Sequence, residues 1–263
     1  MSYGPNPWRQ KHWDWRAAAN FMLGGTGAGL LVATAMAVPS PRPAILLALL
    51  LIAGGLGAVW LEIGRKLRAI HVFFNPRTSW MTRESFAAVV VFALGICALA
   101  LPQAWLTYAC ALAALAFVYC QARILRASKG IPAWRAPEVV TLILASALAE
   151  GAGAALLFET MPAVLVFLEL ALIARLFAWY RFRTALRREL RLGALEEAGR
   201  ILVLLGTIMP LVLTPAVYAV PEVAPLAAFA VIATGWWFKL TLVTRAAFNQ
   251  GFALPHVPVR GAR

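Results

Sequence analysis

Eight long apolar runs divide this chain and leave it few ways to fold. A helix needs about 20 mainly apolar residues to cross the hydrocarbon core of a bilayer, and eight stretches of the sequence meet that length. Proline-containing turns separate the two members of each consecutive pair, because proline ends a helix. The runs predict helices over 17–38, 43–63, 84–101, 104–122, 138–158, 162–180, 199–220 and 223–244.

The predicted fold is an all-α integral membrane protein whose eight transmembrane helices form antiparallel hairpins and two four-helix bundles. Residues 1–263 make one membrane domain, with tails at 1–16 and 247–263. The composition agrees, because 62% hydrophobic and 13% charged residues, with a mean hydropathy of +0.77, lie far outside the range of soluble domains. No cleavable signal peptide is visible, so we expect the first run to act as its own insertion signal.

The basic residues fall almost entirely on one side of the predicted membrane. An even number of helices places both termini on the same side, and of the 24 Lys and Arg residues only Arg42 lies opposite. Basic loops are retained in the cytoplasm, so we expect both termini to face the cytoplasm of a bacterial inner membrane. The net charge of +13 then reflects topology rather than nucleic acid binding. The basic loop 181–200, which interleaves Arg with Leu, fits an interfacial helix or a solvated linker.

Polar groups converge at the cytoplasmic ends of the first three predicted helices. A quinone site needs hydrogen-bond partners for two carbonyls, an aromatic and apolar wall, and an acid or base that moves protons. The candidate acids and bases are Glu62, Glu84 and His71, and the candidate binding residues are Asn20, Arg65, Trp80 and Arg16. The alternative is structural, because Glu62 and Arg65 are spaced to form an ion pair and Glu84 is placed to cap the third helix.

Ionisable residues also lie deeper in the predicted membrane. Glu150 belongs to the fifth helix and Glu169 to the sixth, at comparable depth, and Arg175 follows on the sixth. Charged groups inside a bilayer are costly, so they are candidates for function. These three residues predict either a proton path or a buried structural network in which Arg175 pairs with one of the carboxylates.

The sequence carries no signature of haem or metal binding. Membrane carriers often hold b-type haem between two histidines placed well inside helices, whereas all three histidines of this chain fall on the cytoplasmic side. The three cysteines form no CxxC pair. We therefore expect neither haem nor a metal ion in this chain.

Glycines cluster in the first, second and fifth predicted helices. They occupy positions within 24–29 and 54–57, and Gly151 and Gly153 lie in the fifth helix. Small residues let membrane helices approach closely, so the clusters predict tight helix packing. Room for a flat ligand beside the backbone is the alternative.

Several segments resemble a known family. They are LEIGRKLRAIH at 61–71, PRTSWMTRE at 76–84 and a glycine-rich first helix after Asn20, in a chain without haem histidines. These features resemble the eight-span membrane-anchor subunits of dimethyl sulfoxide reductase and polysulfide reductase type complexes. The resemblance implies a haem-free subunit that exchanges electrons between membrane quinone, either ubiquinone or menaquinone, and a four-cluster ferredoxin-like iron–sulfur partner. That partner would in turn bind a molybdenum or tungsten pterin catalytic subunit.

The resemblance also implies roles for individual residues. Glu62 stands where the family has an acid or histidine in its second-helix motif, and Glu84 matches the family's third-helix glutamate. Both positions are linked there to quinol handling. His71 matches a histidine found in part of the family. The chain departs from the family pattern at 64–68, which read GRKLR where relatives often have Gly-x-Pro-x-Arg.

The two ends of the chain resemble a narrower group. The segments YGPNPWRQKHWDWRAAANFMLGG and NQGFALPHVPVRG look like those of anchor subunits associated with phenylacetyl-CoA:acceptor oxidoreductases. A cytoplasmic sulfite-oxidising complex fits the same topology. The predicted function is thus a quinone-reactive membrane anchor of a pterin and iron–sulfur oxidoreductase. Two alternatives remain: a secondary transporter or proton-conducting protein, and a passive tether without a redox site.

Overall fold

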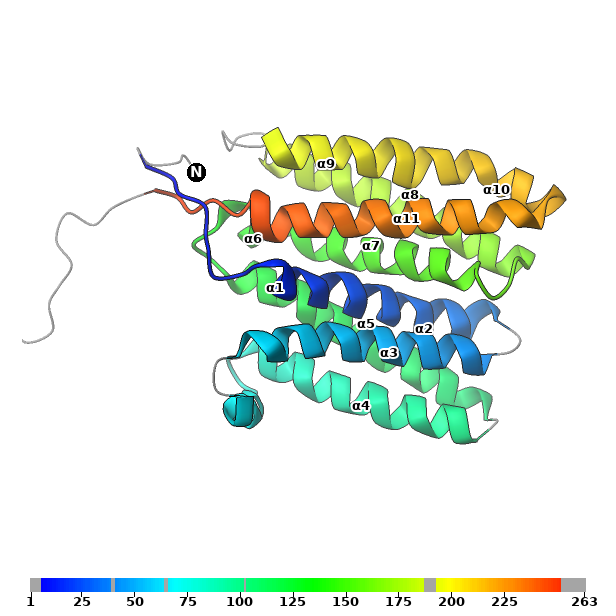
Figure 1. Cartoon of the computed structure of the whole chain (residues 1–263), viewed down its shortest axis with the longest axis horizontal. Helices are drawn as coiled ribbons and strands as arrows, with labels where there is room; N and C mark the ends of the chain where they lie inside the picture. Colours follow the sequence, from blue (N-terminus) through cyan, green and yellow to red (C-terminus); the bar gives the residue numbers. More distant parts are fainter. Residues whose placement is uncertain (1–5, 39–40, 64–65, 102, 187–192, 252–263) are drawn as a thin grey trace, which may run out of the picture.

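Eight helices long and apolar enough to cross a membrane make up most of the computed structural model (Figure 1). The structure describes residues 6–38, 41–63, 66–101, 103–186 and 193–251. Within these residues it contains no strand, only one isolated bridge between two short extended segments. The spans are Trp15–Met36, Pro41–Glu62, Trp80–Ala100, Ala104–Ala127, Glu138–Ala155, Pro162–Leu186, Gly193–Ala219 and Pro221–Arg245. The predicted all-α membrane fold is confirmed.

Three of the described spans change helix type along their length. Single α-helices form the other spans, namely α3 (Pro41–Glu62), α4 (Trp80–Ala100), α5 (Ala104–Ala127), α7 (Glu138–Ala155) and α8 (Pro162–Leu186). Span one joins α1 (Trp15–Ala19), η1 (Asn20–Gly24) and α2 (Gly25–Ala37); span seven joins α9 (Gly193–Val203), η3 (Leu204–Ile208) and α10 (Met209–Ala219); span eight joins η4 (Pro221–Val223), α11 (Ala224–Leu240) and η5 (Thr241–Arg245). The η1, η3 and η5 segments are π-helical turns. Between spans lie the 3-10 helix η2 (Lys66–Phe74) and the short helix α6 (Pro132–Arg135).

The helices pack as two groups of four, in the order of the chain. In the first group α2 packs on α3 and α5, and α4 packs on α3 and α5. In the second group α7 packs on α8 and α11, while α9 and α10 pack on α11. The groups meet chiefly where α2 contacts α7 (Figure 1). Spans one and five are the most buried of the described spans. Span one therefore belongs to the first bundle and also forms most of its contact with the second.

Glycines allow spans one and five to approach closely. A Cβ atom on Gly29 would overlap the backbone carbonyl of Ala147, and one on Gly151 would overlap the backbone of Gly29. Contacts of this kind between backbones need small residues, because any larger side chain separates the helices. The predicted role of the glycines in tight packing is confirmed for this pair.

Predicted and observed helix ends differ mainly on the side of the termini. The α4 helix begins at Trp80 rather than 84, and α5 and α8 run to Ala127 and Leu186 rather than 122 and 180. Hydropathy marks only the bilayer core, whereas helical hydrogen bonding continues into the interface, where long basic side chains keep their charges in water. Most of the 181–200 segment thus continues α8 and α9, and the described part contains no separate interfacial helix; residues 187–192 lie outside the description.

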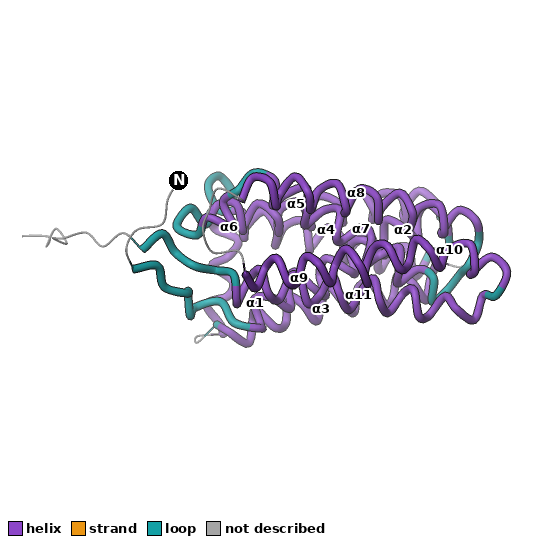
Figure 2. Tube along the Cα trace, turned by 90° about the horizontal axis from the view of Figure 1, so that it is seen from above, coloured by secondary structure: helices purple, strands orange, loops and turns teal. Residues whose placement is uncertain are grey.

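Segments next to both termini pair with each other at one end of the molecule (Figures 1 and 2). The Trp8 amide donates to Asn249 Oδ1 at 3.1 Å, and the Asn249 amide donates to the Trp8 carbonyl at 3.0 Å. Beside them the Gln10 amide donates to the Ala247 carbonyl at 2.9 Å. The Gln10 side chain reaches the Val243 carbonyl at 3.0 Å. The described parts of the two predicted tails are thus bound to each other and to span eight.

Candidate functional site

A buried polar cluster joins spans one, three and four near the end where the termini lie. Asn20 Nδ2 donates to Glu84 Oε1 at 2.8 Å. Gln121 Nε2, from α5, donates to the backbone oxygen of Asn20 at 2.9 Å and to its Oδ1 at 3.1 Å. All three side chains are buried, and Glu84 is 4% exposed. The structure therefore brings together Asn20 and Glu84, as the sequence predicted, and adds Gln121.

The local sequence of α4 explains why Glu84 points inward. Ser79 caps the helix by accepting from the Thr82 amide at 3.3 Å. The buried positions of α4 after Glu84 fall at Ala88, Val91, Gly95 and Ala98, a spacing that marks one face of a helix. Glu84 therefore begins the stripe that packs into the first bundle.

Two cavities lie against the Asn20–Glu84 pair. The larger has a volume of about 400 Å³ and is lined by apolar and aromatic side chains from α3, η2 and α4, including Trp60, Phe73 and Phe92. The smaller, of about 200 Å³, opens toward Trp13 and Glu62. The residues common to both walls are Asn20, Val59, Ile63, Met81 and Glu84.

The larger cavity has the size and lining of a small-molecule site. Small-molecule sites are commonly concave, a few hundred Å³ in volume and mostly apolar, with a few polar groups that fix orientation. Here Trp60 and Phe73 supply aromatic surface, and Asn20, Glu84 and Ser85 supply the polar groups. Asn20 and Glu84 are joined by their own hydrogen bond, so each is held in place before a ligand arrives.

Glu62 lies in the wall of the smaller cavity, whereas Arg16 does not line it. Glu62 is half-buried and lines that cavity. Arg16 pairs with Asp14 at 2.8 Å and donates to the Leu61 carbonyl at 3.4 Å. The Arg16 hydrogen bond lowers the pKa of the Asp14 carboxyl below its usual value. Arg65 lies outside the described residues, so the Glu62–Arg65 ion pair stays a prediction.

His71 and Trp80 lie outside the walls of both cavities. His71 is exposed on η2, where its Nδ1 lies 3.0 Å from the Arg68 carbonyl and its ring meets the edge of Phe74. The Trp80 ring lies 4.2 Å from the guanidinium groups of both Arg83 and Arg123. The short η2 helix directs His71 outward, and the cation–π contacts hold Trp80 at the helix end.

A second polar cluster lies deep inside the membrane domain. Lys239 Nζ pairs with Glu150 Oε2 at 2.8 Å, and both side chains are fully buried. Thr26 Oγ1 donates to the same carboxylate oxygen at 2.7 Å, and Trp236 Nε1 donates to Thr26 at 2.9 Å. The other oxygen, Glu150 Oε1, is buried without a hydrogen-bond partner in the described structure. This cluster joins spans one, five and eight.

Arg175 forms a separate buried anchor, and within the described residues it pairs with neither Glu150 nor Glu169. Its guanidinium donates to the Gly206 carbonyl, to Thr207 Oγ1 at 3.2 Å and to the Val231 carbonyl at 3.4 Å. Lys239, and not Arg175, is the cation that pairs with Glu150. Glu169 is half-buried and has neither an ion pair nor a hydrogen bond within the described residues.

Each π-helical turn adjoins one of these polar clusters. Asn20 opens η1, Gly206 and Thr207 belong to η3, and η5 begins two residues after Lys239. A π turn inside an α-helix widens the backbone and is frequent at functional sites. The turns therefore mark the same places in the fold as the buried polar side chains.

Two adjacent glycines of span one face the two clusters. A Cβ on Gly24 would lie 2.6 Å from Gln121 Nε2, and a Cβ on Gly25 would lie 2.7 Å from Lys239 Nζ. One helix backbone thus separates the end cluster from the deep cluster.

Sequence reasoning missed Lys239, Gln121 and Thr26. Lys239 was counted among the basic residues of the terminal side, yet it lies within span eight and is 0% exposed. A lysine between aromatic and aliphatic residues inside an apolar run is a recognisable signal for an intramembrane pair. Gln121 and Thr26 carry no such signal, because single uncharged polar residues are frequent in membrane helices.

Comparisons with known proteins do not identify a family for this chain. No protein-family model matches the chain, and no curated protein matches it. Among the described residues, no group of three or more His, Cys, Asp and Glu side chains is placed to hold a metal ion.

Proposed function

We propose that this chain is the quinone-reactive membrane subunit of an oxidoreductase complex. The observation that carries the proposal is the buried Asn20–Glu84 pair, which is shared by two cavities near the end of the molecule where the termini lie. A buried carboxyl group beside an apolar, aromatic cavity is a recurrent setting for binding and proton transfer. The family resemblance of the 61–84 region supports the same assignment.

In this proposal the chain's residues orient the ligand and move protons. A bound quinone supplies two-electron redox chemistry that is coupled to the uptake or release of two protons. Asn20 holds the Glu84 carboxyl at the cavity wall, where it can pass a proton to or from a ligand oxygen. Glu62, at the rim of the smaller cavity, links Glu84 to water at the membrane surface. Trp60 and Phe73 exclude water from the larger cavity.

The partners we propose are a four-cluster ferredoxin-like iron–sulfur subunit and a molybdenum or tungsten pterin subunit, docked where the termini pair. Nearly all basic loop residues belong to this end, which supports a cytoplasmic location at a bacterial inner membrane. The cavities lie close to it, which suits electron exchange with a docked cluster. The end segments favour a partner that oxidises phenylacetyl-CoA.

The test is quinone-linked turnover of the assembled complex with Glu84→Gln. We expect a loss of about 100-fold or more, the usual contribution of a positioned acid or base. Turnover with a soluble dye that takes electrons from the partner subunits stays unchanged. Glu159→Gln, on the opposite side of the membrane, is the matched control. Normal quinone-linked turnover of an assembled Glu84→Gln complex contradicts the proposal and favours a passive tether.

We further propose that Glu150, Lys239 and Arg175 carry charge movement through the membrane, with Glu169 as the outer acid of the predicted path. The buried Glu150–Lys239 pair also supports the alternative function, a proton-conducting protein or transporter. Proteoliposomes that hold this chain alone distinguish the two. Proton or solute flux without partner subunits favours the alternative, whereas flux only during quinone turnover of the complex favours a coupled path.

A further inference from the structure

A surface groove runs between α7 and α8 and is lined by no residue of the two polar clusters. Its outer part is a hollow of about 460 Å³ at the end of the molecule that holds the termini, where α7 begins and α8 ends. Its inner part, of about 600 Å³, continues along the same helices and shares Glu138, Phe177 and Arg181 with the outer part. None of these residues belongs to the proposed quinone site.

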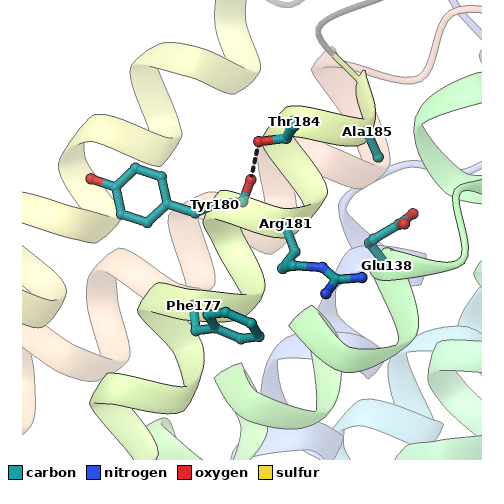
Figure 3. Close-up of a pocket in the computed structure, with 6 residues that line it drawn as sticks. All are labelled: Glu138, Phe177, Tyr180, Arg181, Thr184 and Ala185. Atoms are coloured by element: carbon teal, nitrogen blue, oxygen red, sulfur yellow. Dashed lines mark hydrogen bonds between the residues drawn. The ribbon is translucent and has the colours of Figure 1, made fainter.

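The outer part of the groove offers charges of both signs. Figure 3 shows the Arg181 guanidinium and the Glu138 carboxylate facing the same hollow from neighbouring helices, with the ring of Phe177 beside them. Neither Arg181 nor Glu138 forms an ion pair with another described residue. Thr184 donates to the Tyr180 carbonyl at 2.8 Å, which leaves its hydroxyl oxygen free to accept.

The inner part of the groove is apolar and faces outward. It is lined by Leu144, Ala145 and Leu148 of α7 and by Ala174 and Ala178 of α8. From Glu138 to Leu148 the groove descends about 15 Å along the helix axis. Phe177 on its wall is 64% exposed, on the side of α8 that presents other large apolar side chains outward.

We infer that this groove binds a phospholipid with an ethanolamine headgroup. The guanidinium of Arg181 matches a phosphate, because Arg forms two parallel hydrogen bonds with phosphate oxygens. The Glu138 carboxylate and the Thr184 hydroxyl accept from the ammonium group. An acyl chain follows the apolar wall into the bilayer. The charged part of the groove lies at the end of the molecule with the termini, and the apolar part lies deeper along the helices. A phospholipid in the cytoplasmic leaflet has its headgroup and acyl chains in the same order.

The pair of opposite charges sets the headgroup preference. A groove with Arg181 alone would favour an anionic lipid, as basic pockets between membrane helices do. Glu138 repels a second negative charge and gives an ammonium group a partner. Phosphatidylethanolamine therefore fits better than phosphatidylglycerol.

The test is native mass spectrometry of the full chain, purified and then equilibrated with equal amounts of palmitoyl-oleoyl phosphatidylethanolamine and phosphatidylglycerol. We expect the wild type to retain phosphatidylethanolamine in preference. Arg181→Gln lowers retention of both lipids, by about five-fold for one lost basic contact. Glu138→Gln shifts the preference toward phosphatidylglycerol. Arg126→Gln and Glu197→Gln, exposed residues on the same side but outside the groove, leave retention unchanged.

Three results overturn the inference. The first is equal or greater retention of phosphatidylglycerol by the wild type. The second is wild-type retention in Arg181→Gln. The third is an unchanged headgroup preference in Glu138→Gln. Both substituted side chains lie at the surface, so the variants are expected to fold, and Arg181→Lys serves as a charge-keeping variant that restores part of the binding.

Discussion

Replacing Lys239 with methionine removes the only cation that contacts Glu150 in the described structure. The Lys239 Nζ and Glu150 Oε2 atoms are 2.8 Å apart, and both side chains are 0% exposed, so water does not reach the ion pair. After the replacement Glu150 Oε2 keeps only the Thr26 hydroxyl, and Oε1 still has no partner. Removing one member of a buried ion pair typically costs about 3–5 kcal/mol, because it leaves an uncompensated buried charge. We expect a loss of that size in the free energy of unfolding.

The measurement is reversible unfolding of the purified chain in mixed micelles of lipid-like detergent and sodium dodecyl sulfate. Lys129→Met is the matched control, since this lysine is exposed, and a change within about 0.5 kcal/mol is expected. The double variant Glu150→Gln with Lys239→Met restores most of the loss, because neither charge remains buried alone. A Lys239→Met loss below about 1 kcal/mol, or a double variant as unstable as the sum of the two single variants, refutes the reasoning.

Three further predictions follow from single contacts. Gly29→Ala forces spans one and five apart, so we expect it to lower the free energy of unfolding by about 1–3 kcal/mol. Gly57→Ala is the control, because a Cβ atom at Gly57 meets open space and the free energy of unfolding stays unchanged. Unfolding in the same mixed micelles measures both variants. Asn249→Ala removes a hydrogen bond that holds the N-terminal segment, so amide exchange there speeds up while the membrane helices stay protected. The Arg16 hydrogen bond lowers the pKa of Asp14, so the ionised Asp14 carboxylate stabilises the fold above about pH 4. This contribution is lost as the pH falls through the lowered pKa. Asp14→Asn is therefore expected to remove this part of the acid dependence of amide exchange.

The spans could be predicted from the sequence because membrane insertion depends on a local property. About 20 apolar residues are needed wherever the helix finally packs, so the order and number of the helices follow from the runs themselves. The helix ends on the terminal side could not be predicted as well, since α5 and α8 continue through the interface with arginine and tyrosine on their surfaces. Water at the interface hydrates the polar side chains, so the helical backbone continues beyond the apolar run.

The deep cluster shows what the sequence leaves open. Glu150 was identified by its depth alone, but its partner depends on which spans meet in space. Arg175 and Lys239 were both available cations, and the packing of α7 against α11 places Lys239 beside Glu150. Arg175 instead reaches carbonyl and hydroxyl groups around η3. No local pattern in the sequence predicts where a π turn will place these carbonyl and hydroxyl groups.

The end cluster was more predictable because Asn20 and Glu84 both lie near the terminal-side ends of their spans. Asn20 falls about one turn inside the predicted edge of the first helix, and Glu84 falls at the predicted edge of the third, so the two residues share a similar depth. His71 shares their depth in the sequence, yet η2 directs it away from the cavities. Depth can be predicted from position in a run, but the direction of a side chain in a connecting segment cannot.

Span one connects the two clusters physically. Asn20 belongs to the end cluster and Thr26 to the deep cluster, six positions and about 9 Å further along the helix. Between them Gly24 lets Gln121 approach one face and Gly25 lets Lys239 approach the other, so a shift of this backbone moves both. Charges inside the domain are weakly screened, and a proton gained or lost at Glu84 therefore changes the field at the Glu150–Lys239 pair. On this arrangement, a change of charge at the Asn20–Glu84 pair acts on the Glu150–Lys239 pair through span one.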